Sequence, residues 1–129
     1  MSHTNPTAVS FDTIAQIAIT VDDLARAKNF YQDTLGMKFL FDAGQLAFFK
    51  CGDIRLMLGT SEKPEPHGGT ILYYKVEDIH ATHSALKQHG VEFIQDPHLV
   101  AKMPDHDLWM AFLKDSEGNT LGVMSEVQN

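Results

Sequence analysis

The sequence predicts an α+β domain built from two copies of a strand, helix, strand, strand, strand unit, written βαβββ. Two observations carry this prediction. The segment Val21-Asp22-Asp23-Leu24 recurs as Val76-Glu77-Asp78-Ile79, at an offset of about 55 residues, and such internal similarity indicates a repeated structural unit. In both copies this segment leads into a helical pattern and then into three strand-like segments.

The first strand and the helix start of each copy follow from local patterns. Apolar and less apolar residues alternate over 16–21, and 71–76 is a second apolar and aromatic run, so we expect both segments to be strands. Asp22 or Asp23 in copy one, and Asp78 in copy two, can accept hydrogen bonds from the unpaired amides of a first helical turn. A helix of about three turns is therefore expected after each carboxylate.

The first helix is expected to bury one stripe of side chains and to end at a glycine. Residues spaced by three and four positions lie on one face of a helix. The apolar residues with this spacing are Leu24, Ala27, Tyr31 and Leu35. Gly36 follows the first helix and Gly90 the second, and glycine readily adopts the left-handed conformation that ends many helices.

Three further strands are expected after each helix. In copy one they are 37–41, 46–51 and 54–58. The turns Asp42-Ala43-Gly44 and Gly52-Asp53 separate them, as in β-hairpins. In copy two the strands are 91–95, 108–114 and 120–124, with the turn 115–119 before the last one.

These elements define one domain over 14–127, preceded by an N-terminal tail, 1–13. Module one covers 14–60 and module two covers 70–127. The segment 61–69 between them contains two prolines and two glycines, so we expect it to be a linker.

Composition restricts the classes of function. The chain has 129 residues, of which 43% are hydrophobic and 21% charged, which is typical of a folded globular domain. Its 17 acidic residues outnumber its 10 basic residues and give a formal net charge of -7. The average field repels phosphate backbones and anionic lipid headgroups, so neither nucleic acid nor a membrane surface is expected as a partner.

Cysteine usage and the N-terminal segment favour a cytoplasmic protein. Cys51 is the only cysteine, which excludes an intrachain disulfide and fits a reducing compartment. The segment 1–13 lacks the apolar run of a signal peptide, and the longest apolar stretches of the chain have the length of strands. We therefore expect no membrane span and a cytoplasmic location.

Two local motifs accompany the repeat. The segment that begins Thr20-Val21-Asp22-Asp23-Leu24 leads through Phe30-Tyr31 to Leu35-Gly36-Met37, and Phe112-Leu113-Lys114 leads into the turn Asp115-Ser116-Glu117-Gly118-Asn119. Together with the repeat, these motifs resemble signatures of the vicinal oxygen chelate (glyoxalase/bleomycin-resistance/dioxygenase) superfamily across Ile14 to Val127. The resemblance implies a glyoxalase/bleomycin-resistance-like fold, in which two βαβββ modules form curved sheets around a cleft with the helices outside.

The resemblance also implies where a metal would bind, because metal-dependent members take their ligands from the first and last strand of each module. The matching positions are Gln16, Ile71, Gly122 and, in copy one, Met57, or Leu56 if the register differs by one. Divalent metals need imidazole, carboxylate, thiolate or other oxygen donors, which isoleucine and glycine side chains lack. Some glyoxalase I relatives carry glutamine at the first position, but one amide cannot hold a metal. We therefore expect no metal ion and no cofactor, and a polar cleft residue at Gln16.

The seven histidines do not supply an alternative metal site in the sequence. His80 and His83 have a spacing that allows two ligands on one helix, but no third donor is placed near them. His80 and His89 are expected to face solvent, because Ile79, Thr82 and Leu86 mark the buried stripe of this helix. His3 belongs to the tail and His67 to the linker.

Two further histidines flank a predicted hairpin turn at 103–106. If Val100 pairs with Trp109, His98 lies about opposite Ala111, and roughly 15 Å of strand separates it from His106. The two rings are therefore not expected to share an ion. His106 is expected either in a solvated turn or as a polar rim or acid/base group of the cleft.

Strand alternation predicts which side chains line the cleft. If Gln16 faces inward, so do Ala18 and Thr20, because successive side chains of a strand point to opposite faces. The same alternation places inward Arg55, Met57, Ile71, Tyr73, Lys75, Gly122 and Met124, whereas that of Trp109 is ambiguous. The predicted ligand-binding residues are Gln16, Arg55, Met57, Tyr73, Lys75, His106, Trp109 and Met124.

This lining combines apolar and aromatic surface with one or two cations, which suits a hydrophobic or planar ligand that carries a negative group. We expect a metal-independent protein that binds a small hydrophobic or aromatic molecule, as the superfamily's antibiotic-sequestering proteins do. The alternative is a lyase, isomerase or dioxygenase of the same superfamily, with Gln16, Tyr73, Lys75 or His106 in non-standard roles; no catalytic residue is assigned. A third alternative is an accessory or regulatory domain without turnover. The resemblance also implies a homodimer, with the cleft inside one chain or shared between two.

Overall fold

The computed structural model describes residues 14–60 and 70–128. The predicted tail, the predicted linker and the two histidines in them, His3 and His67, lie outside the described residues. The described part contains two βαβββ modules, each with one four-stranded sheet, so the predicted α+β fold of two repeated modules is confirmed. None of the described helices is long and apolar enough to cross a membrane.

Module one forms a mixed sheet with one helix. Its elements are β1 (Gln16–Val21), α1 (Leu24–Asn29), the π-helical turn η1 (Phe30–Thr34) that continues α1, β2 (Lys38–Ala43), β3 (Leu46–Cys51) and β4 (Ile54–Thr60). The strand order is β1-β4-β3-β2, in which β1 is parallel to β4 and the other pairs are antiparallel. The parallel pair is possible because the helix carries the chain from one end of the sheet to the other.

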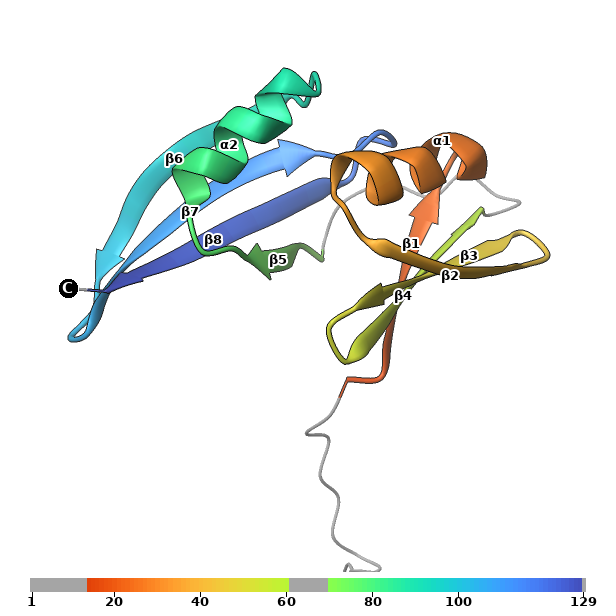
Figure 1. Cartoon of the computed structure of the whole chain (residues 1–129), viewed down its shortest axis with the longest axis horizontal. Coiled ribbons are helices and arrows are strands. Elements are labelled where there is room, and N and C mark those ends of the chain that lie inside the picture. Colours follow the sequence, from red (N-terminus) through yellow and green to blue (C-terminus); the bar gives the residue numbers. More distant parts are fainter. Residues whose placement is uncertain (1–13, 61–69, 129) are drawn as a thin grey trace, which may run out of the picture.

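Module two repeats this topology. Its elements are β5 (Leu72–Lys75), α2 (Ile79–Gln88), β6 (Phe93–Lys102), β7 (His106–Lys114) and β8 (Thr120–Gln128). The strand order is β5-β8-β7-β6, again with a parallel first pair. Both helices lie on the same side of the molecule, each over its own sheet (Figure 1).

Each sheet therefore has one helix-covered face and one face without a helix, which we call the open face. The strand register assigns the side chains, because directly paired residues point to the same face. The open face of module one carries Gln16, Ala18, Thr20, Lys38, Phe41, Ala43, Leu46, Phe48, Lys50, Arg55, Met57 and Gly59. The open face of module two includes Tyr73, Lys75, His98, His106, Met110, Phe112, Gly122, Met124 and Glu126.

Both helices begin and end as the sequence predicts. The Asp23 carboxylate accepts a hydrogen bond from the amide three residues later at 3.0 Å. The Asp78 carboxylate accepts two bonds of 3.1 Å from amides of the first turn of α2. Gly36 and Gly90 follow the helices with φ of 73° and 80°, a backbone conformation that residues other than glycine rarely adopt.

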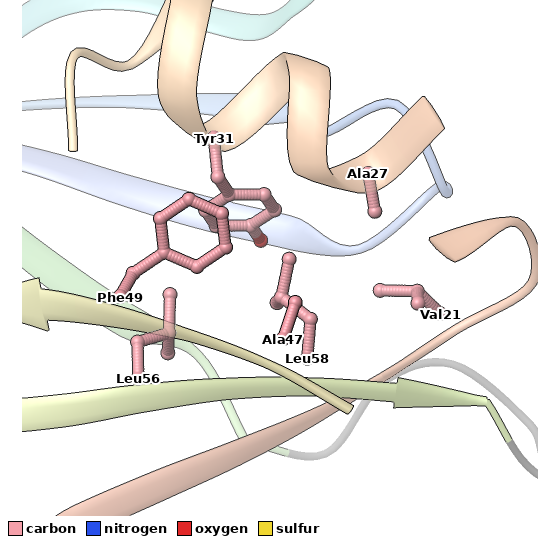
Figure 2. Packing of buried hydrophobic residues seen from close by; sticks show 7 residues of the cluster. All are labelled: Val21, Ala27, Tyr31, Ala47, Phe49, Leu56 and Leu58. Atoms are coloured by element: carbon pink, nitrogen blue, oxygen red, sulfur yellow. The ribbon is translucent and has the colours of Figure 1, made fainter. Parts of the chain in front are cut away.

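The core of module one lies between helix and sheet. Ala27 and Tyr31 project from the helix onto strands β3 and β4 and have no exposed surface (Figure 2). Five strand residues complete this cluster: Val21, Ala47, Phe49, Leu56 and Leu58. The predicted apolar stripe is confirmed, since Leu24 and Leu35 pack against the same cluster.

The core of module two is built in the same way, and the two cores are continuous. Ile79 and Leu86 of α2 are buried against β7 and β8. Phe30 and Leu35, at the end of the first helix, pack against both core clusters. The two modules therefore share apolar packing on the helix side of the molecule.

Several strands differ in length from the prediction. Strand β6 extends to Lys102, β7 begins earlier, at His106, and β8 extends to Gln128. Strand β5 is shorter than predicted and does not include Ile71. The sequence pattern missed the extensions because the ends of a long hairpin carry polar residues. Their backbone groups still find partners in the neighbouring strand, so the ladder continues beyond the apolar pattern.

The predicted pairing between β6 and β7 is wrong by one residue. Leu99, not Val100, lies opposite Trp109, and His98 lies opposite Met110. The register of this pair shifts at three places, which indicates β-bulges or irregularities along β6. A bulge adds an unpaired residue to one strand, which sequence alternation does not reveal.

A turn of module two ties the modules together. We call Asp115, Glu117 and Asn119 the turn clamp. The buried Asp115 carboxylate accepts a 2.7 Å hydrogen bond from the Tyr31 hydroxyl of module one. Asn119 donates from its side-chain amide to the carbonyl of Thr20 at 3.3 Å. Because both partners belong to module one, the turn clamp helps to set the orientation of the two open faces.

Within the turn clamp, Glu117 accepts the most hydrogen bonds from module one. It accepts hydrogen bonds from the amides of Asp22 and Asp23, at 3.0 and 2.7 Å, at the start of α1. It also forms an ion pair with Arg26, with Nε 2.6 Å from Oε2, and its side chain is fully buried. An acidic side chain at a helix N-terminus also suits the helix dipole.

A small hollow lies between the modules on the helix side. It has a volume of about 130 Å³ and includes Leu35, Met37, Tyr74, Leu86 and Leu113 in its lining. The Tyr74 hydroxyl is buried and has no hydrogen-bond partner among the described residues. Burial is the main reason that the pKa of Tyr74 lies well above the ordinary value of 10.0. A buried hydroxyl without a partner costs free energy in the folded state.

We expect Tyr74→Phe to stabilise the protein by about 1 kcal/mol, because it removes an unpaired buried hydroxyl and keeps the ring. Urea unfolding of both proteins at pH 7, followed by tryptophan fluorescence, measures the change. A variant less stable than the original protein by about 1 kcal/mol or more contradicts this expectation, because such a loss means that the hydroxyl has a favourable partner.

Candidate ligand-binding site

A cluster of three predicted residues lies at one end of the open face of module one. Gln16 of β1 is directly opposite Arg55 of β4. The Arg55 Nε donates a 2.9 Å hydrogen bond to the Gln16 Oε1, and the Gln16 Nε2 lies 3.8 Å from the Sδ of Met57. The structure therefore brings these three residues together. Gln16 and Arg55 are exposed and Met57 is half-buried, so solvent and solutes reach the cluster.

Aromatic rings continue this cluster across the sheet. Phe48 of β3 pairs with Met57, and the Arg55 guanidinium lies over its ring at 5.5 Å from the ring centroid. On the other side Phe48 stacks with Phe41 of β2, with centroids 4.7 Å apart and planes inclined by 22°. Phe41 is 46% exposed, so a flat apolar surface faces solvent beside the cation.

On the open face of module two, Tyr73 covers Gly122. The residues are directly paired in the parallel strands β5 and β8. A Cβ placed on Gly122 meets the Tyr73 ring at 2.6 Å, so the ring occupies the space of the missing side chain. Tyr73 also contacts Phe112 edge to face, with centroids 5.7 Å apart, and is 47% exposed. Glycine is therefore required for the present position of this predicted ligand-binding ring.

We expect Gly122→Ala to displace the Tyr73 ring and to destabilise the protein by about 1 to 2 kcal/mol, because the new methyl group overlaps the base of a ring. Chemical denaturation measures the loss. Gly59→Ala is the matched control. Its Cβ comes too close to the flexible end of Leu46, at 2.7 Å from Cδ2, and makes an ordinary contact of 3.8 Å with the Gln45 carbonyl oxygen. A loss of less than about 1 kcal/mol is expected there. Equal losses in the two variants contradict the proposed packing of Tyr73.

Lys75 and Met124 are paired neighbours on the same open face. The Lys75 Nζ lies 3.2 Å from the Glu126 carboxylate, and the lysine side chain is 65% exposed. Met124 of β8 is directly opposite Met110 of β7 and is half-buried. Lys75 therefore already has an intramolecular partner, so it is a weaker candidate than Arg55 for binding an anion.

Trp109 lies on the other side of the sheet. It pairs with the buried Ser125, packs against the core of module two and contacts the His80 ring of α2 edge to face, with centroids 5.0 Å apart. The helix therefore covers the face on which the indole lies. The structure separates Trp109 from the other predicted ligand-binding residues, because the parity of β7 puts Ala111 and Trp109 on the core side.

His106 belongs to the open face of module two but lies at its far end. It pairs with Gln128, and its Nδ1 is 2.7 Å from an Asp105 carboxylate oxygen. The hydrogen bond with His106 lowers the pKa of Asp105. His98 lies opposite Met110, four residues of β7 away from His106, which corresponds to about 13 Å of strand. The structure therefore does not bring these two rings together.

The residues at the four metal-ligand positions do not fit a divalent metal. The Gln16 oxygen already accepts a bond from Arg55, Met57 offers a thioether, and Gly122 has no side chain. Ile71 supplies no donor either. The 14–60 and 70–128 ranges contain no group of three or more His, Cys, Asp or Glu residues placed to hold a metal ion. The donor chemistry of these positions therefore disagrees with a metal centre of the usual kind.

Sequence analysis missed the contribution of β2 and β3 to this surface. Phe41, Phe48, Lys38 and Lys50 lie on the open face, but the predicted lining of module one came only from its first and last strands. Alternation in β3 alone was a usable signal, since Phe49 is buried and its neighbours Phe48 and Lys50 must point the other way.

Comparisons with known proteins agree with the fold. The model of the Glyoxalase/Bleomycin resistance protein/Dioxygenase superfamily matches residues 13–123. A glyoxylase-like domain-containing protein of Didymella fabae is 34% identical over 116 residues, which are 83% of this chain and 88% of that protein.

Solved structures show the same architecture. A crystal structure of a putative glyoxalase family protein from Bacillus anthracis has a TM-score of 0.76 at 20% identity and covers 93% of this chain and 99% of its own. Lactoylglutathione lyase from Agrobacterium tumefaciens has a TM-score of 0.67 at 23% identity, covering 95% and 96%. At these identities the two structures support the fold alone.

Proposed function

Because this chain belongs to the Glyoxalase/Bleomycin resistance protein/Dioxygenase superfamily, we propose that it binds a small hydrophobic or aromatic molecule on its open faces without using a metal ion. The observation that carries this proposal is the chemistry of the open faces. Aromatic rings and one arginine occupy the surface, whereas the four metal-ligand positions offer one amide and one thioether. Apolar surface with a few polar groups is typical of small-molecule sites.

The metal part of the proposal is tested by elemental analysis of protein purified without added metal and by titration with Zn²⁺, Ni²⁺, Fe²⁺ and Mn²⁺. We expect less than stoichiometric metal and no saturable change in the thermal unfolding midpoint. One tightly bound ion per chain that survives dialysis contradicts metal independence. The Gln16→Ala variant then tells whether that ion uses the predicted position. If the variant binds the same amount of metal, the ion lies elsewhere.

The ligand part is tested by isothermal titration calorimetry with planar aromatic compounds. Phe48→Ala and Tyr73→Ala are expected to weaken binding, because each removes a ring from the open faces. Trp109→Phe is the control, since this indole lies on the helix side. Loss of binding in the control alone argues for a site on the helix side and against the open faces.

A second candidate is an enzyme: a lyase, isomerase or dioxygenase with non-standard residues. It is favoured by two exposed groups able to exchange protons, Tyr73 and Lys75, which lie two positions apart on one face of β5. Substrate profiling of the original protein with Tyr73→Phe and Lys75→Ala tests it. Turnover that is indifferent to both substitutions removes these residues as candidates.

We further propose that the protein is a cytoplasmic homodimer in which a second copy helps to enclose the ligand. Exposed apolar side chains such as Phe41, Tyr73 and Ile71, which are 46%, 47% and 37% exposed, support it. The free thiol of Cys51 suits a reducing compartment. Light scattering coupled to gel filtration measures the mass; a monomer at micromolar concentration contradicts the dimer.

A further inference from the structure

Three cations lie side by side across the open face of module one. Lys38 of β2 is directly opposite Lys50 of β3, and Lys50 is directly opposite Arg55 of β4. Neighbouring strands are separated by about 4.8 Å, so the three side chains start from adjacent points of one row. All three are exposed, and the neighbouring residues Phe49 and Leu56 are buried on the other face.

This row is electrostatically unfavourable by itself. Like charges that are directly opposite in a sheet destabilise it. The complete open face of module one contains no carboxylate, and neither Lys38 nor Lys50 has an ion pair with any residue that the structure describes. In contrast, Lys28 on the helix side lies 2.9 Å from Asp42. A chain with a net charge of -7 thus has, within residues 14–60 and 70–128, a positive row on one face that no described carboxylate compensates.

One member of the row is already oriented. The hydrogen bond from Arg55 Nε to Gln16 and the contact of the guanidinium with the Phe48 ring hold this side chain against the sheet. The described hydrogen bonds use only Nε, which leaves the terminal nitrogens of the guanidinium to bind an incoming group. A planar guanidinium with two adjacent N–H donors matches a carboxylate or phosphate.

The next row on the same face is apolar. It consists of Phe41, Phe48 and Met57. It lies two residues further along β3 and β4, which is about 6.6 Å, and three residues further along β2, where the register shifts. This spacing is close to the length of one aromatic ring with its substituent. A flat apolar group can therefore rest on the exposed Phe41 ring, which is stacked on the largely buried Phe48 ring, while an acidic group attached to it reaches the cations.

We propose that Lys38, Lys50 and Arg55 form an anion-binding row that selects small aromatic ligands carrying a carboxylate or phosphate group. This inference rests on the proposed function and specifies its ligand class. The row supplies charge and the bidentate donor, and the adjacent rings supply the apolar surface. A bound anion would offset the repulsion between the three cations of the row.

The test compares 2-naphthoate with its neutral analogue 2-naphthamide, and with inorganic phosphate, by isothermal titration calorimetry at low ionic strength. The original protein is expected to bind 2-naphthoate at least about tenfold more tightly than 2-naphthamide. In the Lys38→Gln/Lys50→Gln double variant, we expect this preference to fall to about threefold or less. Lys87→Gln, on the exposed face of α2, removes a charge away from the row and should keep the preference.

A second measurement does not need a ligand. At low salt, the double variant is expected to have a higher thermal unfolding midpoint than the original protein, because it relieves like-charge repulsion. Added salt should reduce the difference between the two proteins. A lower midpoint in the double variant at low salt overturns the claim that the row is uncompensated.

The outcomes separate this inference from the proposed function. Equal binding of 2-naphthoate and 2-naphthamide, unchanged in the double variant, overturns the anion-binding row and leaves aromatic binding in place. Binding of phosphate that is lost in the double variant, without binding of either naphthyl compound, supports the row and contradicts the proposed aromatic site. No binding of any of the three compounds overturns both.

Discussion

Replacing Asp115 with alanine is expected to destabilise the protein by about 3 to 5 kcal/mol, the largest loss among the single substitutions considered. The Asp115 carboxylate is buried and accepts the Tyr31 hydroxyl at 2.7 Å, the amides of Glu117 and Asn119 at 2.8 Å each, and the Asn119 side-chain amide at 2.9 Å. Alanine leaves these donors, which are buried or partly buried, without their acceptor. Each unpaired buried donor costs about 1 to 3 kcal/mol, reduced where the turn relaxes toward solvent.

Urea unfolding at pH 7 measures this loss, and Tyr31→Phe provides the graded control. Burial, followed by the nearby Asp115 carboxylate, raises the pKa of Tyr31 well above 10.0, so the hydroxyl remains a donor at ordinary pH. Tyr31→Phe removes one of the bonds to Asp115 and should cost about 1 to 2 kcal/mol. A loss below about 1 kcal/mol for Asp115→Ala shows that the turn clamp does not hold the modules together.

Replacing Glu117 with glutamine is expected to cost about 2 to 3 kcal/mol at pH 7, with a loss that depends on pH. Burial by itself raises the pKa of Glu117. Hydrogen bonds from the Arg26 side chain, the Asp23 amide and the Ser116 hydroxyl outweigh it and lower the pKa from 4.5 to about 2. The folded protein therefore holds the ionised carboxylate more tightly than the unfolded chain does.

The direction of the pH dependence follows from this lowered pKa. The contribution of Glu117 is fully present above pH 4.5 and is lost as the pH falls toward about 2, because the carboxylate is then protonated in the folded state as well. The stability difference between the original protein and Glu117→Gln should shrink over this interval. Unfolding curves at about pH 7, 4 and 3 measure it. A difference that stays constant with pH contradicts the assignment of the shift to Glu117.

Asp23→Asn is a useful comparison for this experiment. Asp23 caps α1 through its own side chain, whereas its amide donates to Glu117. Asparagine keeps both bonds, since it also caps helices well. The variant should therefore retain the pH-dependent contribution of Glu117, which separates the effect of the buried carboxylate from a general weakening of the helix start.

The turn clamp also connects stability with the proposed function. The open faces belong to different modules, and the described contacts between modules lie on the helix side, at the shared apolar core and at the turn clamp. Variants of Asp115 or Glu117 change the contacts that relate the two faces without touching either of them. A ligand that uses both faces at once is expected to bind these variants more weakly, whereas one that uses a single face is not.

Local rules were sufficient for the helices and for the repeated topology. Asp78 was identifiable as a cap, and the first cap was narrowed to Asp22 or Asp23, because a carboxylate bonds the amides two or three residues ahead, which is a short-range interaction. The structure selects Asp23. Gly36 and Gly90 were identifiable because the left-handed conformation at a helix end favours glycine. Both features depend on residues within a few positions of each other, so the sequence contains the information.

The candidate site was only partly predictable. Alternation correctly placed Met57 and Tyr73 on the faces opposite the core, because a strand has a fixed period of two. It was ambiguous for Trp109, which the register of β7 puts on the helix side. It also gave no indication that Arg55 joins Lys38 and Lys50 in one row. That row depends on which strands are neighbours, which is a property of the whole sheet.

By itself, the sequence determined the two βαβββ modules, the helix ends, the buried stripe of the first helix and the absence of donor side chains at Ile71 and Gly122. Only the tertiary structure decided the bulged register of β6, the row of cations on the open face and the closure of the turn clamp on the first helix. The physical reason is range: propensity, capping and alternation act between residues close in the chain. Strand pairing and a contact such as Tyr31 to Asp115, 84 residues apart, exist only once the chain has folded.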